Sequence, residues 1–346
     1  MTGSAQPHKH AAAREDGQSR RRINLALQGG GSYGAFTWGV LDALLADPRI
    51  ELEGISGTSA GAMNAVALVS GLARAQADGL PPDAMREAAR QALARLWDGV
   101  GVMGTLLAGV PLPAAQAVIG LFSPWLAPYQ ANMLGINPLR QLIEREVDFD
   151  LVGRQQLVKL FVTATNVRTG RGEVFSGARV TADALMASAC LPMLFKAVEI
   201  DGEHYWDGGY SGNPALYPLI YETQCSDVLL VQISPQEDAQ VPTVSADIFE
   251  RINQIAFNAS LLAELRAIEF VRRLLDENRL DASRYKNVRL HRIDAGNRIA
   301  RLGSSTRADS AFLERLFALG REDGAQWIRQ HFDDDPGAHH GKAKAA

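Results

Sequence analysis

Two short apolar runs near the start of the chain each end in a glycine-containing turn that leads into a helical stretch. The first run covers residues 23–27 and precedes a helical pattern over residues 34–46. The second covers residues 50–55 and precedes a run of small apolar residues, 63–69. Continuous apolar runs predict strands buried on both faces, and the repeated order of strand and helix predicts parallel pairing. The sequence therefore predicts an α/β fold with helices on both faces of a mostly parallel sheet.

The rest of the chain continues this pattern without an internal repeat or a clear linker. Further strands are predicted at residues 158–164, 227–233 and 287–293. Residues 245–280 predict one or two long helices with Ser245 or Asp247 as the cap, and residues 312–319 and 327–332 predict terminal helices. We therefore expect one domain over residues 23–332, with its C-terminal helical part at residues 245–332.

Both ends of the chain are polar. Residues 1–22 lack the apolar core of a signal peptide, so we expect a flexible leader and a cytoplasmic protein. Residues 333–346 predict a disordered tail. With 35 basic and 39 acidic residues the net charge is −4, which argues against a nucleic-acid partner. Two cysteines, Cys190 and Cys225, and no histidine cluster with ligand spacing predict neither disulfides nor a metal, and we expect no cofactor.

Residues 99–139 contain no Asp, Glu, Lys, Arg or His. A spanning helix needs about twenty uninterrupted apolar residues, and Pro111, Pro113, Pro124 and Pro128 interrupt this run. It predicts an apolar cap of short helices and turns. One interpretation is an ordinary buried insertion, and the other is a wall for acyl chains that also contacts a membrane peripherally.

The motif Gly57-Thr58-Ser59-Ala60-Gly61 is a G-x-S-x-G pentapeptide between a predicted strand and a predicted helix. That setting is typical of a nucleophile elbow, a tight turn that needs small neighbours such as Gly57, Ala60 and Gly61. The turn aims the Ser59 hydroxyl at a helix N-terminus, where negative charge is favoured. Ser59 is therefore the candidate nucleophile.

A glycine-rich loop, residues 29–34, follows the first predicted strand and allows two interpretations. It matches the dinucleotide fingerprint G-x-G-x-x-G, with Glu51 or Glu53 near the position of a ribose-binding acid. Alternatively, the N–H groups of consecutive glycines form an oxyanion hole. The second strand ends in the serine motif instead of an acid, which favours the oxyanion hole. Its candidate donors are Gly29, Gly30 and Gly31.

The third motif is Asp207-Gly208-Gly209, which by itself is also a common turn sequence. An Ala-Ser-x-x-x-Pro-x-x-Phe block precedes it at residues 187–195, and Asn213-Pro214 follows. Together with Thr163-Ala164-Thr165-Asn166, the three motifs in this order resemble the patatin-like phospholipase family over roughly residues 24–233. The resemblance implies a three-layer α/β/α fold with an apolar helical cap.

The resemblance also implies a serine lipid acyl hydrolase with a Ser59–Asp207 dyad and phospholipids, lysophospholipids or related acyl esters as substrates. Ala60 joins the glycines as an oxyanion donor, and Gly34, Gly57, Gly61, Gly208 and Gly209 are motif positions. Two alternatives remain: an acyltransferase or transacylase on the same dyad, and a non-catalytic lipid-binding protein. The oligomeric state is left open.

Two positions depart from the family pattern. Tyr33 stands where the loop often carries Arg or Lys, which leaves the headgroup preference open. Lys196 replaces a proline, where we expect only a local adjustment. His291 is the one histidine placed for a Ser…Asp…His triad, and a structural role is the alternative that we favour.

Overall fold

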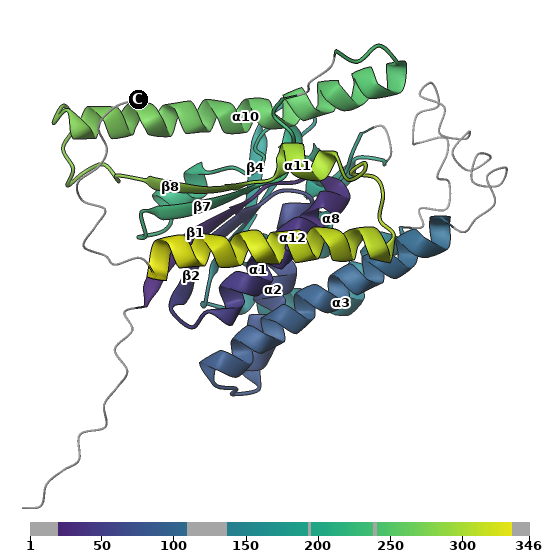
Figure 1. Cartoon of the computed structure of the whole chain (residues 1–346), viewed down its shortest axis with the longest axis horizontal. Helices are drawn as coiled ribbons and strands as arrows, with labels where there is room; N and C mark the ends of the chain where they lie inside the picture. The colour runs from purple at the N-terminus through teal and green to yellow at the C-terminus, as the bar shows by residue number, and fades with distance from the viewer. Residues whose placement is uncertain (1–19, 109–136, 193–194, 238–240, 334–346) are drawn as a thin grey trace, which may run out of the picture.

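The computed structural model describes residues 20–108, 137–192, 195–237 and 241–333, and in them one sheet lies between two layers of helices (Figure 1). The strand order is β5-β6-β3-β2-β1-β7-β8, and β4 also pairs with β3. The parallel strands are β1 (Arg21–Leu27), β2 (Ile50–Gly57), β3 (Lys159–Asn166), β7 (Asp227–Gln232) and β8 (Arg289–Asp294). The antiparallel strands are β4 (Gly172–Ser176), β5 (Val198–Ile200) and β6 (Glu203–Asp207). The predicted α/β/α architecture is confirmed.

Side chains of the central strand β1 alternate between the two helical layers. Leu25 and Leu27 pack into the larger core cluster, whereas Ala26 faces the smaller one. The larger layer holds α1 (Gly34–Ala46), α2 (Ala60–Ala77), α3 (Pro82–Ala108) and α12 (Ser310–Ile328). The smaller layer holds α9 (Tyr217–Tyr221) and α10 (Ser245–Asp276). The remaining helices are α6 (Pro138–Glu146), α7 (Phe149–Arg154), α8 (Ala182–Ser188) and α11 (Gly296–Ala300).

The C-terminal helix α12 is part of the main core, because it packs against the first helix α1 at two glycines. A Cβ on Gly39 would overlap the Phe317 carbonyl oxygen, and a Cβ on Gly320 would overlap the Phe36 carbonyl oxygen. The two helices therefore approach within backbone contact, which only glycine permits. In this way α12 is fixed next to α1, the helix that follows the glycine-rich loop (Figure 1).

The elements differ from the predicted ones mainly at their ends. β1 begins at Arg21 instead of Ile23, because the Arg21 N–H donates a hydrogen bond to the Arg49 carbonyl. Residues 245–276 form one helix, and Val244 occupies its N-cap position, so the expected cap by Ser245 or Asp247 is wrong. The short strands β4, β5 and β6 were not predicted, because runs of three to five partly polar residues carry little periodicity.

The uncharged segment is described only in part. Residues 99–108 are the last turns of α3, where Val102 and Leu106 are exposed. The rest of the cap expected over residues 99–139 falls mainly on residues 109–136, which lie outside the described residues, as do most of the leader and the tail. Among the helices that the structure describes, none combines the length and the apolar character that crossing a membrane requires.

Candidate active site

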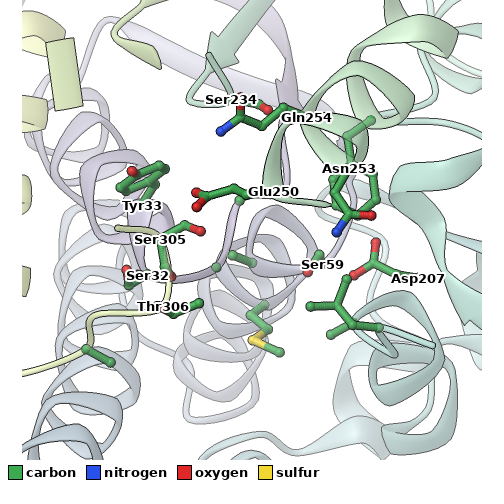
Figure 2. Close-up of a pocket in the computed structure, with 18 of the residues that line it drawn as sticks. Ser32, Tyr33, Ser59, Asp207, Ser234, Glu250, Asn253, Gln254, Ser305 and Thr306 are labelled. Carbon is green, nitrogen blue, oxygen red and sulfur yellow. Dashed lines mark hydrogen bonds between the residues drawn. The ribbon is translucent and has the colours of Figure 1, made fainter. Parts of the chain in front are cut away.

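Strand pairing brings the serine turn and the aspartate turn to the same edge of the sheet. Within β3, Val162 lies opposite Gly57 of β2, and Ala164, two residues later, lies opposite Asp207 of β6. Ser59 follows Gly57 by two residues, so both side chains reach the region just beyond the carboxyl end of β2. Both line one cavity of about 440 Å³ (Figure 2).

Ser59 sits in a strained turn at the start of α2. Its backbone has φ 53° and ψ −122°, a combination that non-glycine residues rarely adopt. The turn is held by the Ser59 N–H, which donates to Ser188 Oγ at 2.9 Å. A Cβ on Gly57 would lie 2.7 Å from Ala62 N, and one on Gly61 would overlap the Leu27 carbonyl oxygen. Both motif glycines are therefore required by close backbone packing.

Asp207 ends β6 and is 1% exposed. Its Oδ1 accepts a hydrogen bond of 2.7 Å from the Gly209 N–H. Its Oδ2 is buried and has no well-formed hydrogen bond with any described residue, and the Ser59 hydroxyl lies beside the carboxyl as a weak donor. Burial raises the pKa of Asp207 to about 7, against the opposing effects of Gly209 and Ser59. This carboxyl can therefore exchange a proton near neutral pH.

The aspartate turn is fixed to its neighbours as tightly as the serine turn. A Cβ on Gly208 would overlap the Thr163 carbonyl oxygen. The Thr165 hydroxyl donates to the Asp207 carbonyl at 2.8 Å, and the Thr58 hydroxyl donates to the Gly212 carbonyl at 2.6 Å. A Cβ on Gly209 would lie 2.7 Å from the Phe257 ring of α10. These contacts explain the D-G-G motif and the Thr165 position of the Thr-Ala-Thr-Asn motif.

The residues of the glycine-rich loop have two different roles. Gly30, Gly31 and Ala60 line the cavity. Gly31 and Ala60 are also the first residues of helical turns, whose N–H groups have no partner in the helix itself. The expectation that Gly29 is an oxyanion donor is wrong, because its N–H donates to Asn213 Oδ1 at 2.7 Å.

Gly29 and Gly34 instead allow close packing around the serine. A Cβ on Gly29 would lie 2.8 Å from Ser59 Cβ, and one on Gly34 would lie 2.7 Å from Ala60 Cβ. Any side chain at either position would press on the serine turn.

A C-terminal loop, residues 303–308, holds the glycine-rich loop from the other side. The Ser305 carbonyl accepts hydrogen bonds from the Ser32 N–H at 2.9 Å and from the Ser32 hydroxyl at 2.8 Å. The Tyr33 hydroxyl donates to the Gly303 carbonyl at 2.7 Å. Burial and the nearby Glu250 raise the pKa of Tyr33 to about 12, so the phenol stays protonated as a donor. No motif in the sequence pointed to this loop.

The walls of the cavity are of two kinds. One wall is apolar, and the other carries polar side chains of α10, for which the sequence predicted a long helix but no part in the site (Figure 2). The apolar wall includes Met63, Trp97, Val100, Leu139, Leu191 and Pro192. The α10 side presents Glu250, Asn253, Gln254 and Phe257. An apolar wall beside a nucleophile suits an acyl chain.

The residues proposed for the rival interpretations are occupied elsewhere. Glu51 pairs with Arg20 and Arg22, and Glu53 accepts the N–H groups of Gln224 and Cys225, so neither serves as a ribose-binding acid.

Within the described ranges, no three His, Cys, Asp or Glu side chains are grouped so that they could hold a metal ion.

His291 lies away from Ser59. Its Nε2 contacts Asp227 Oδ1 at 2.8 Å, at the start of β7, which is the opposite edge of the sheet from the end of β2. Its ring also packs against the Trp327 ring. His291 therefore has the structural role that the sequence favoured.

This chain is similar to a known protein family and to several solved structures. A family model described as patatin-like phospholipase matches residues 25–220, more than half of the chain, including the glycine-rich loop, the serine motif and Asp207. Among solved structures, VipD from Legionella pneumophila is 17% identical with a TM-score of 0.40, over 96% of this chain and 72% of VipD. The type III effector protein ExoU is 16% identical with a TM-score of 0.33, over 90% of this chain and 53% of ExoU. This chain thus spans about half the length of ExoU. A search of curated proteins found no match.

Proposed function

Because this chain belongs to the patatin-like phospholipase family, whose members are in general lipid acyl hydrolases, we propose that it cleaves phospholipid or lysophospholipid acyl esters with a Ser59–Asp207 dyad. One observation carries the proposal. A buried carboxyl whose pKa is raised to about 7 lies beside a serine on a strained turn, in a cavity with an apolar wall.

Ester cleavage begins with attack of Ser59 Oγ on the acyl carbonyl carbon, while its proton passes to Asp207 Oδ2. That oxygen is the one without a well-formed hydrogen bond, so it is free to accept the proton. The N–H groups of Gly30, Gly31 and Ala60 stabilise the negative charge that develops on the carbonyl oxygen. When the ester C–O bond breaks, Asp207 returns the proton to the leaving alcohol.

Water then hydrolyses the acyl-enzyme, with Asp207 as the base that removes its proton. A free aspartate with its usual pKa is a weak base toward serine. The raised pKa of Asp207 brings it close to the working pH, where general base catalysis is most effective. The fixed Gly209 N–H keeps the carboxyl oriented, so no histidine is needed between the two groups.

The proposal is tested with a fluorophosphonate serine probe and a phospholipid hydrolysis assay on the same folded proteins. We expect Ser59→Ala and Asp207→Asn to lose both labelling and hydrolysis. His291→Ala, the control for a triad, should keep both. Loss of activity in a folded His291→Ala protein, or labelling that survives in Ser59→Ala, would overturn the dyad.

The same assay separates hydrolysis from the alternatives. An added alcohol acceptor that captures the acyl group, in place of release as free fatty acid, would indicate a transacylase on the same dyad. A folded wild-type protein that binds lipid but neither labels nor hydrolyses in liposomes would indicate a lipid-binding protein instead.

A further inference from the structure

A second cavity, of about 500 Å³, adjoins the catalytic cavity. Tyr33, Pro235, Glu250 and Gln254 line both cavities and so form the wall between them. The remaining lining comes from the segment after β7, from α10 and from the region of α11, namely Glu237, Arg251, Asn297, Ala300, Arg301 and Ser304. Apart from Tyr33, all of these residues lie beyond the 25–220 range of the family match.

The second cavity carries two acidic and two basic side chains that are not paired with one another. Glu237, Glu250, Arg251 and Arg301 form no ion pair with any residue that the structure describes. Among the residues that the structure describes, the Arg251 guanidinium donates to neutral groups, Gln254 Oε1 at 3.2 Å and the Gln236 carbonyl at 3.0 Å.

A nearby arginine outside this cavity, in contrast, does form an ion pair. Arg298, one turn before Arg301, is paired with Asp323. The cavity thus keeps charges of both signs available for a ligand, which suits a group that itself carries both signs.

We propose that this second cavity is the headgroup site and that the preferred headgroup is zwitterionic, with its phosphate at Arg251 and Arg301 and its ammonium at Glu237 and Glu250. The inference rests on the proposed function, because it places the acyl chain in the first cavity and the ester at Ser59. Tyr33 puts a neutral ring on the shared wall, so the positive charge for the phosphate comes from the C-terminal part of the chain.

The catalytic test uses three substrates with the same acyl chain in neutral detergent micelles: phosphatidylcholine, phosphatidylglycerol and a headgroup-free p-nitrophenyl ester. We expect wild type to prefer phosphatidylcholine to phosphatidylglycerol. Arg301→Gln should lower the ratio of kcat/KM for phosphatidylcholine to that for the p-nitrophenyl ester by about five- to tenfold, the range of one charge-assisted contact. Glu237→Lys should shift the preference toward phosphatidylglycerol.

The matched control is Arg292→Gln, an exposed arginine on β8 that lines neither cavity. It should leave both ratios unchanged. A wild-type preference for phosphatidylglycerol, or selectivity that neither Arg301→Gln nor Glu237→Lys alters, would overturn the headgroup assignment.

A binding measurement keeps this inference separate from the catalytic proposal. Glycerophosphocholine should bind the Ser59→Ala protein, as followed by calorimetry or by ligand-observed NMR, and Arg301→Gln should weaken that binding by about fivefold or more. Absence of binding to the Ser59→Ala protein, or equal binding with and without the Arg301→Gln substitution, would count against the headgroup site. If binding follows the expectation but no ester is hydrolysed, the catalytic proposal fails and the headgroup site stands.

Discussion

The two walls of the catalytic cavity are built in different ways. On the wall that carries Ser59 and Asp207, positions are set by backbone packing, because a single added carbon at Gly61 or Gly208 would overlap a carbonyl oxygen. We call this the first wall. The second wall lies opposite and is formed by α10 and the 303–308 loop, which present side chains such as Glu250 and Thr306 that are exposed. We therefore expect the first wall to tolerate almost no change of shape, and the exposed side chains of the second wall to tolerate many substitutions.

This difference separates chemistry from recognition. Proton transfer and oxyanion stabilisation depend on displacements of a fraction of an ångström, so they need groups held by closely packed backbone. Recognition of a headgroup depends on charge and hydrogen bonding at a partly solvated surface, which individual side chains can supply. The predictions below test whether the two walls differ as this contrast requires, and they run from the largest expected effect to the smallest.

The largest effect is expected at the base of the dyad. Asp207→Asn removes the proton acceptor while keeping the shape of the side chain, so kcat should fall by at least about 10³-fold. Steady-state hydrolysis of a p-nitrophenyl ester measures this loss, and circular dichroism checks the fold. Activity within tenfold of wild type would mean that another group accepts the Ser59 proton.

The next largest effect is expected in the free energy of unfolding, which should fall more for a substitution on the first wall than for one on the second. Gly61→Ala forces a methyl group against the Leu27 carbonyl, so we expect a loss of about 3 kcal/mol or more in unfolding free energy, or failure to fold. On the second wall, Gln254→Ala should change stability by no more than about 0.5 kcal/mol. Urea denaturation measures both variants. Equal losses would show that the two walls are packed alike.

The pH dependence follows from the buried carboxyl. Because the pKa of Asp207 is about 7, kcat/KM should fall close to tenfold per pH unit below that value, once the base is protonated. A rate that stays constant down to pH 5 would contradict the raised pKa.

Stability should change with pH in the opposite sense. The pKa of Asp207 in the fold lies above its unfolded value of 3.8, so between about pH 4 and 7 the unfolded chain loses a proton that the fold retains. This group therefore stabilises the fold at low pH and loses that contribution as the pH rises to 7. Asp207→Asn should raise Tm relative to wild type, and by more at pH 8 than at pH 5.

A smaller effect is expected at Ser188, a positioning residue. Its hydroxyl accepts the Ser59 N–H, and Ser188→Ala leaves that donor without a partner in a strained turn. We expect kcat to fall by about tenfold, equivalent to about 1.4 kcal/mol, with KM little changed. The rate of fluorophosphonate labelling should fall in parallel. A change in KM alone would indicate that Ser188 affects substrate binding instead.

The smallest effect is expected where the two walls meet. Tyr33→Phe removes only the hydrogen bond to the Gly303 carbonyl and keeps the ring in place. A loss of about 1 kcal/mol or less corresponds to a two- to fivefold fall in kcat/KM. A fall of a hundredfold would mean that the Tyr33 hydroxyl takes part in the reaction itself.

Much of the first wall was predictable from the sequence, because the tight turns that present Ser59 and Asp207 leave motifs in the chain. Gly57 is needed inside the serine turn itself, whereas Gly61 and Gly208 are needed by close packing against the more distant Leu27 and Thr163. The exception, Gly29, shows the limit of this reasoning. Its N–H was expected to face the oxyanion, but the side chain of Asn213 binds it from 184 residues away.

The second wall could not be predicted, because its residues are brought together by long-range packing and not by a local turn. Glu250, Gln254 and Ser305 belong to no motif, because an exposed or half-buried side chain on this wall satisfies no local backbone requirement. Their place in the cavity depends on how α10 and α12 pack onto the sheet. The positions of the five parallel strands along the chain, the fold class and the candidate serine and aspartate followed from the sequence alone, since periodicity and tight turns act over short stretches of chain. The tertiary structure decided which N–H groups remain free, how deeply Asp207 is buried and which charges face the substrate, since these depend on long-range packing.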